Sequence, residues 1–284
     1  MTEFGYTMMC EQSPPDALVA DIRRAEEAGF DFSVISDHFQ PWLVEQGHSP
    51  YAWSVLGAAA AVTERIGLMT YVTCPTVRYH PAIVAQKAAT MQILSGGRFR
   101  LGLGAGENLN EHVVGDGWPA VGTRHSMLSE AVDVIGALFD ADDGEAVSYH
   151  GEFFDLETAR LWDRHEQRVP IAVAVSGEES CELAGRKADL MIAVEPKAEL
   201  GEMFDAAGGA GKGIKGADLV ADDRLKGEWD VVVVGPHFAG AFVARDLGDA
   251  GADAERHFEY FVTYDRERVT AAAQALLRHL IRDR

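Results

Sequence analysis

Asp37 and His38 are the first residues in the chain whose types and spacing could do chemistry. They come at the end of a short apolar run, residues 32–36 (FSVIS), and Trp42 follows soon after. Histidine exchanges a proton near neutral pH, and a neighbouring carboxylate can orient its ring. Such a pair at the end of a buried strand is a candidate for general acid–base chemistry. The structural alternative is that Asp37 caps the next helix and His38 packs beside it.

Polar residues also follow the other expected strands. They are Glu11 after residues 4–10, Cys74 after 67–73, Glu107 and Asn110 after 99–103, and Ser176 after 169–175. Apolar runs without alternation suit parallel strands that are covered on both faces. In a parallel α/β barrel the carboxyl ends of the strands carry the chemistry, so these side chains are expected to gather around one opening.

The order of strands and helices predicts an α/β fold, a (β/α)8 barrel of the TIM type. Four strand–helix repeats fit into about 110 residues, and such a barrel is typically about 250 residues long. The doubly wound fold has the same order, but the polar residues after every strand favour the barrel. Helices are expected at 17–28, 51–65, 81–94, 130–139 and 179–187, a small hairpin at 147–154, and a sixth strand at 190–194.

The pattern changes after residue 205. Residues 206–217 are rich in Gly, Ala and Lys, which predicts a linker or mobile loop between the six-stranded part, 1–205, and a divergent α/β segment, 218–284. In that segment, strands are expected at 229–234 and 258–264 and helices at 237–246 and 266–281. Two interpretations stay open: the two strands complete the barrel as its seventh and eighth, or the segment is a foreign fragment.

Composition limits the classes of function. The net charge of −20 repels nucleic acid and anionic membranes, because both bind basic patches. Many acids with few lysines also suit a protein that stays soluble in high salt. Cys10, Cys74 and Cys181 lie far apart, and neither they nor the histidines show metal-ligand spacing. With no signal peptide and no spanning apolar run, a cytoplasmic protein with a small-molecule substrate is expected, and a homodimer is left open.

Four motifs, in order, resemble one family. They are residues 36–42 (SDHFQPW) with 47–50 (GHSP), 75–81 (PTVRYHP), 104–111 (GAGENLNE) and 184–189 (AGRKAD). Together they resemble the F420-dependent glucose-6-phosphate dehydrogenase group of the luciferase-like superfamily, over about residues 4–200. The resemblance implies a barrel that binds the deazaflavin coenzyme F420 and transfers a hydride to or from a sugar or alcohol carbon. The rivals are an FMN-dependent luciferase-like monooxygenase and a degenerate barrel that only binds or senses a ligand.

The resemblance also implies roles for residues. His38 would take the substrate's hydroxyl proton or stabilise the transition state, with help from Glu11. Glu107 would be the acid near the cofactor's ring nitrogen, and Trp42 would wall the pocket. The residues expected to bind the cofactor are Asp37, Tyr71, Val72, Cys74, Gly106, Asn110, Ser176 and Gly177. Asp37 could instead orient His38, and a cis peptide bond is expected between Tyr71 and Val72. Ser176 and Gly177 would bind through their backbone N–H groups.

The chain departs from the family pattern in its later part. Lys197 stands where the family places a cation of its phosphate site, but the nearby Glu195 would repel a phosphate dianion. A neutral alcohol, another sugar or the reverse reaction therefore stay open beside glucose 6-phosphate. Residues 237–249 and 258–266 resemble instead the end of a DICT-type sensory domain, which motivates the foreign-fragment interpretation. NAD is not expected, because the glycines of 102–106 lack the third glycine of the dinucleotide fingerprint.

Overall fold

The computed structural model describes residues 3–193, 198–209, 228–234, 239–246 and 258–263. The chain forms two compact units, Met1–Ile214 and Lys215–Arg284. The first unit contains a six-stranded sheet and a two-stranded hairpin, and the second contains a three-stranded sheet.

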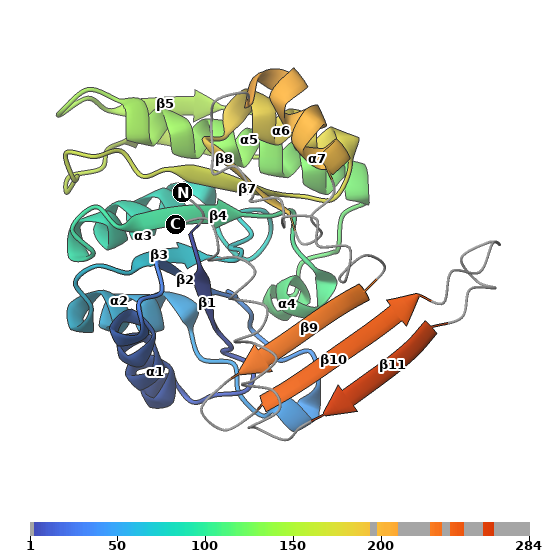
Figure 1. The fold of residues 1–284 in the computed structure, drawn as a ribbon. Coiled ribbons are helices and arrows are strands. Elements are labelled where there is room, and N and C mark those ends of the chain that lie inside the picture. Colours follow the sequence, from blue (N-terminus) through green and yellow to red (C-terminus); the bar gives the residue numbers. More distant parts are fainter. Residues whose placement is uncertain (1–2, 194–197, 210–227, 235–238, 247–257, 264–284) are drawn as a thin grey trace. The chain divides into compact units, whose positions relative to one another are not determined.

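A six-stranded sheet, in which every neighbouring pair of strands is parallel, forms the centre of the first unit. Its strands, in spatial order, are β1 (Gly5–Met8), β2 (Phe32–Ile35), β3 (Gly67–Thr70), β4 (Phe99–Leu103), β7 (Ile171–Val175) and β8 (Leu190–Ala193). Helices cover one face of this curved sheet (Figure 1). Because the strands are parallel, their carboxyl ends share one edge, and the residues that follow them are brought to the same opening.

Five of the helices in the described residues overlap those that the sequence predicts, and two short ones, α4 (Asn108–Glu111) and α7 (Ala198–Phe204), were not predicted. The five are α1 (Pro15–Ala28), α2 (Ala52–Val62), α3 (Pro81–Leu94), α5 (Val121–Asp140) and α6 (Glu178–Lys187). Helix α1 starts at a proline and stops at Gly29, whose φ of 91° is left-handed. Helix α5 starts well before the expected Glu130, because its first turns are polar and lack the apolar periodicity that marks a helix.

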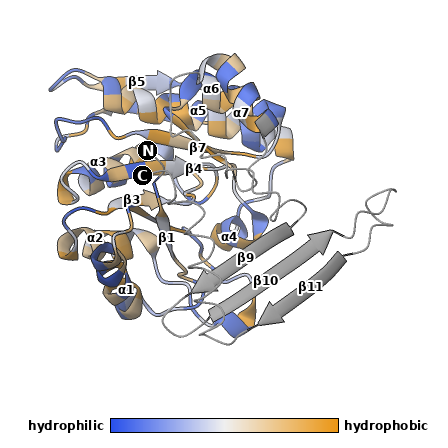
Figure 2. Ribbon diagram, viewed as in Figure 1, coloured by the Kyte–Doolittle hydropathy of each residue, from blue (hydrophilic) through white to orange (hydrophobic). Residues whose placement is uncertain are grey.

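The core lies on both faces of the sheet. The larger cluster packs the sheet against the helices, and Figure 2 shows hydrophobic residues along β7 and α2. A smaller cluster on the other face joins Val34, Met69, Ala172 and Ile192 from four different strands. Burial on both faces explains why these strands read as continuous apolar runs in the sequence.

A hairpin outside the sheet is tied to α5 by one carboxylate. Its strands are β5 (Val147–His150) and β6 (Asp155–Ala159), so the return strand begins just beyond the predicted hairpin. The Glu130 carboxylate accepts hydrogen bonds of 2.7 to 3.2 Å from three consecutive backbone N–H groups, residues 152–154. A Cβ at Gly151 would lie 1.9 Å from Oε1 of Glu130, so a side chain there would displace this carboxylate from the N–H groups that it binds.

The second unit corrects one expectation. Strands β9 (Glu228–Val234), β10 (Ala239–Asp246) and β11 (Phe258–Thr263) form an antiparallel sheet with β10 in the centre. The helix expected at 237–246 is wrong, because β10 pairs along its length with a strand on each side. Strands β9 and β11 both pair with β10 in this sheet, and completion of the barrel by this segment stays a prediction.

The expected linker begins inside helical structure. Residues Asp205–Gly209 continue α7 as a π-helical turn. This turn packs on α6, where a Cβ at Gly185 would lie 2.6 Å from the Cβ of Ala207. Residues 210–217 and the helix expected at 266–281 lie outside the described residues, and the foreign-fragment interpretation stays a prediction.

Candidate active site

His38 and Glu11 meet where β1 and β2 end. Nδ1 of His38 lies 2.7 Å from Oε1 of Glu11, and both side chains are largely buried. The ring is poorly aligned for a hydrogen bond at Nδ1, yet a proton must lie between the two atoms, because two lone pairs at this distance would repel each other. The contact therefore directs the other ring nitrogen, Nε2, away from Glu11.

Ser36 also contacts the Glu11 carboxylate. Its hydroxyl donates a 2.6 Å hydrogen bond to the same oxygen, Oε1 of Glu11. Burial opposes the charge on Glu11, but the contacts with His38 and Ser36 outweigh it and lower the pKa of Glu11 to about 2. Behind Ser36, the fully buried thiol of Cys10 lies 3.1 Å from the Ser36 carbonyl oxygen, and burial raises its pKa to about 12.

The carboxylate of Asp37 is surrounded by hydrogen-bond donors. Oδ2 accepts hydrogen bonds from Trp53 Nε1 at 3.0 Å and from Thr73 Oγ1 at 2.8 Å. Oδ1 accepts from Tyr79 Oη at 3.3 Å and lies 3.5 Å from the guanidinium of Arg78. Asp37 is 2% exposed, so its side chain holds the strand end together and does not cap the next helix.

Arg78 pairs with two acids, Asp37 and Glu111. Besides Asp37, it reaches the fully buried Glu111 through its backbone N–H, at 2.8 Å, and its Nε, at 3.4 Å. Burial raises the pKa of Glu111, and Arg78 only partly offsets this effect. No role was assigned to Glu111 from the sequence, although it closes the 104–111 motif and lies one helical turn after Glu107.

The segment after β4 supplies the remaining wall. Oδ1 of the buried Asn110 accepts the backbone N–H groups of Phe39 and Gln40 at 2.9 and 3.2 Å, which leaves Nδ2 as its donor for a ligand. Gly106 has a φ of 86°, and a Cβ there would lie 3.6 Å from the Cβ of Cys74. Glu107 is exposed and precedes α4 without capping it.

The expected cis peptide bond between Tyr71 and Val72 is confirmed. It directly follows β3, and Val72 lies so close to Gly104 that a Cβ on that glycine would be 2.5 Å from Val72 Cγ2. Tyr71 is 36% exposed, while Phe39 and Trp42 are 56% and 60% exposed. The centroid of the Trp42 ring is 5.5 Å from that of His38. The strand ends thus carry open aromatic surface beside the histidine.

Ser176 and Gly177 differ from the simple phosphate-binding arrangement. Both backbone N–H groups already donate to Oγ of Ser180, at 3.0 and 3.2 Å. They follow β7 and precede α6 as expected, but a phosphate would have to displace the serine hydroxyl to reach them. Lys197 and Glu195 lie outside the described residues, within which no group of His, Cys, Asp and Glu could hold a metal ion.

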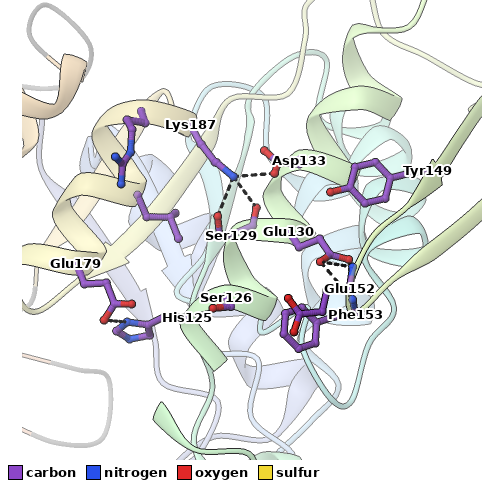
Figure 3. Close-up of a pocket in the computed structure, with 12 residues that line it drawn as sticks. His125, Ser126, Ser129, Glu130, Asp133, Tyr149, Glu152, Phe153, Glu179 and Lys187 are labelled. Carbon is purple, nitrogen blue, oxygen red and sulfur yellow. Dashed lines mark hydrogen bonds and ion pairs between the residues drawn. The ribbon is translucent and has the colours of Figure 1, made fainter. Parts of the chain in front are cut away.

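A cavity of about 350 Å³ lies elsewhere, between α5, α6 and the hairpin (Figure 3). Most of its charged side chains are already paired with protein atoms. Lys187 contacts Asp133 at 2.7 Å, His125 contacts Glu179 at 2.9 Å, and Glu130 holds the hairpin. None of the strand-end residues lines this cavity, so it is not the candidate active site.

Among the described residues no helix is long and apolar enough to cross a membrane.

Comparison with known proteins identifies the family. The model of the luciferase-like monooxygenase family matches residues 2–221, and the chain belongs to this family. The F420-dependent glucose-6-phosphate dehydrogenase of Microbacterium testaceum is 43% identical over 68% of this chain and 57% of that protein. The F420-dependent hydroxymycolic acid dehydrogenase of Mycobacterium tuberculosis is also 43% identical, over 66% of this chain and 52% of that protein.

A solved structure agrees with this assignment. An F420-dependent secondary alcohol dehydrogenase, in complex with an F420–acetone adduct, is 34% identical with a TM-score of 0.69. The match covers 72% of this chain and 63% of that one. This chain therefore spans less than two thirds of the length of these relatives. The residues that the family model matches, 2–221, contain the six-stranded sheet.

Proposed function

We propose that this chain is a coenzyme F420-dependent oxidoreductase that transfers a hydride between the deazaflavin and an alcohol or sugar carbon. The observation that carries the proposal is the Glu11–His38 pair, in which one ring nitrogen is held by a buried carboxylate. Such a histidine is prepared to take a proton from a hydroxyl group. The relatives at 43% and 34% identity are named for the same coenzyme and for alcohol or sugar oxidation.

The residues around the opening fit a flat ring system. Tyr71, Phe39 and Trp42 present exposed aromatic surface, on which an apolar ring can lie. Gly104 and Gly106 keep the chain after β4 free of side chains on that side. When bound, F420 would supply the ring carbon that accepts or gives the hydride.

The chain's own residues would move the protons and shape the pocket. His38 would take the hydroxyl proton at Nε2, since Nδ1 faces Glu11. Glu107, which is exposed beside Gly106, would hold the second exchangeable proton. Trp42 would limit the access of water to His38. Asn110 would position the backbone after β2 and offer Nδ2 to the cofactor.

The substrate is proposed to be a neutral alcohol or sugar, because Glu195 lies two residues before the expected phosphate contact Lys197 and would repel a phosphate dianion. A cytoplasmic location is part of the proposal. It is supported by the free cysteines Cys10 and Cys181, which are buried as thiols and suit a reducing compartment.

Titration of the purified chain with F420, FMN and NADP⁺, followed by turnover assays on alcohols and sugars, tests this function. Selective F420 binding with reduction of the coenzyme by one of these substrates is the expected result. Tight FMN binding without F420 affinity would indicate a monooxygenase. F420 binding without turnover on the whole panel would indicate a binding or sensory protein.

A further inference from the structure

Ser36 and His38 both contact the same carboxylate oxygen of Glu11. Oε1 of Glu11 is 2.6 Å from Oγ of Ser36 and 2.7 Å from Nδ1 of His38. Glu11 is 3% exposed, so protein groups rather than bulk water surround this carboxylate. The position of that oxygen therefore depends on how many of these donors are present.

Donor and acceptor roles can be assigned to the hydrogen bonds among Glu11, Ser36 and Cys10. A serine hydroxyl has one hydrogen, and a length of 2.6 Å to a carboxylate is typical of a charge-assisted O–H···O⁻ bond. The Ser36 hydrogen is thus committed to Glu11. The Cys10 thiol, 3.1 Å from the Ser36 carbonyl and 3.2 Å from its Oγ, is then left to donate toward Ser36.

Ser36 is better placed than Glu11 to fix this arrangement. It directly follows β2, which is hydrogen-bonded to a strand on each side, and its side chain has a single rotatable bond before the oxygen. Glu11 lies beyond the end of β1 and has three rotatable bonds, so without Ser36 its carboxylate can turn away from His38.

We propose that Ser36 is a positioning residue, which holds Oε1 of Glu11 against Nδ1 of His38 and so keeps Nε2 as the ring atom that faces the opening. Only the use of Nε2 as the acceptor of the substrate's hydroxyl proton rests on the proposed function. The holding of Glu11 is a property of the chain alone. The titratable groups that face this arrangement are Cys10, Glu11, Asp37 and His38.

Three variants test the proposal. Ser36→Ala removes the hydroxyl, and Ser36→Thr restores it. Ser33→Ala is the matched control, because Ser33 is a buried serine of the same strand whose hydroxyl donates to the Tyr6 carbonyl oxygen at 2.9 Å. The first readout is the titration of the Glu11 carboxyl group in the protein without cofactor, followed by carbon-13 NMR. The second is the pH profile of the single-turnover rate with F420.

Ser36→Ala should raise the pKa of Glu11 from about 2 toward its ordinary value of 4.5, and Ser36→Thr and Ser33→Ala should not. The single-turnover rate in Ser36→Ala should fall across the pH profile and return to the parent value in Ser36→Thr, because loss of the hydroxyl lets the Glu11 carboxylate turn away from His38. An unchanged Glu11 titration in Ser36→Ala, or an equal shift in Ser33→Ala, overturns the proposal. If no variant turns over F420, the proposed function fails, while the titration still decides the role of Ser36.

Discussion

The indole of Trp53 and the carboxylate of Asp37 are joined by a hydrogen bond of 3.0 Å, which links helix α2 to the end of strand β2. Trp53 is 6% exposed and Asp37 is 2% exposed, so the link is shielded from water. Trp53, Thr73, Tyr79 and Arg78 together place donors next to both carboxylate oxygens of Asp37. The acid next to His38 therefore serves the scaffold of the opening.

Asp37→Asn should lower the free energy of unfolding by about 3–5 kcal/mol, because it removes one partner of a buried ion pair and turns an acceptor into a donor that faces other donors. Urea denaturation measures this loss. Asp21→Asn is the control, since Asp21 is equally shielded at 7% exposure but pairs with Arg24, whose side chain is 67% exposed. A loss at Asp37 no greater than that at Asp21 would contradict the scaffold role.

Glu11 should make the protein sensitive to strong acid. Its folded-state pKa of about 2 is below the ordinary 4.5, so its stabilisation is complete above pH 4.5 and is lost as the pH falls through 2. At neutral pH it is worth about 3 kcal/mol. Glu11→Gln should be less stable at pH 7 and lose less stability between pH 4.5 and 2. Glu27→Gln, at an exposed site on α1, should keep the parent's profile, and a parallel profile for Glu11→Gln would refute the assignment.

His38→Ala should bind F420 with the parent affinity but lose turnover, with partial rescue by added imidazole, because the imidazole is the proposed proton acceptor. Thermal stability, F420 affinity and the single-turnover rate are measured on one preparation. A lower melting temperature with an unchanged single-turnover rate would make His38 a structural residue.

Glu107→Gln should keep F420 bound and slow hydride transfer by about 10²–10⁴-fold, the usual range for a lost acid–base group. The side chain is exposed and does not cap α4, so the stability of the fold should not change. The pH–rate profile checks the prediction, and a profile identical to that of the parent would remove Glu107 from the proton transfers.

The ammonium group of Lys87 lies among three aromatic rings, with distances to the ring centroids of 3.5 Å for Tyr79, 5.2 Å for Tyr51 and 5.3 Å for Trp53. Its Nζ has no hydrogen-bond partner in the described part of the chain, so cation–π attraction is its main compensation for burial. Lys87→Met should cost about 1–2 kcal/mol, and Lys87→Arg should cost less. Denaturation curves decide, and a gain in stability for Lys87→Met would mean that desolvation outweighs the attraction.

Strands and helices of the first unit could be predicted because local signals mark them. Continuous apolar runs indicate the parallel strands, and Pro15 and Gly29 mark the ends of a helix. The error at 237–246 arose because the pattern of that segment does not reveal that a strand pairs with it on each side. Strand pairing between distant segments is a tertiary effect that overrides local preference.

The contact between Glu11 and His38 follows from strand order alone, since adjacent parallel strands bring their ends together. The partners of Asp37 could not be predicted in this way. Trp53 comes from the start of α2, and Tyr79 comes from the loop before α3, so both depend on how helices pack on the sheet. The same holds for Ser180, whose hydroxyl takes the N–H groups expected for a phosphate.

The hydrogen bonds from the N–H groups of residues 152–154 to Glu130 link local unfolding of the hairpin turn to that of helix α5. A hairpin of two short strands has little stability of its own, and here the N–H groups at its turn are satisfied by a side chain of α5. Local unfolding of α5 would release that turn at the same moment. The free energy of opening that hydrogen exchange measures at this turn should therefore not exceed that of α5.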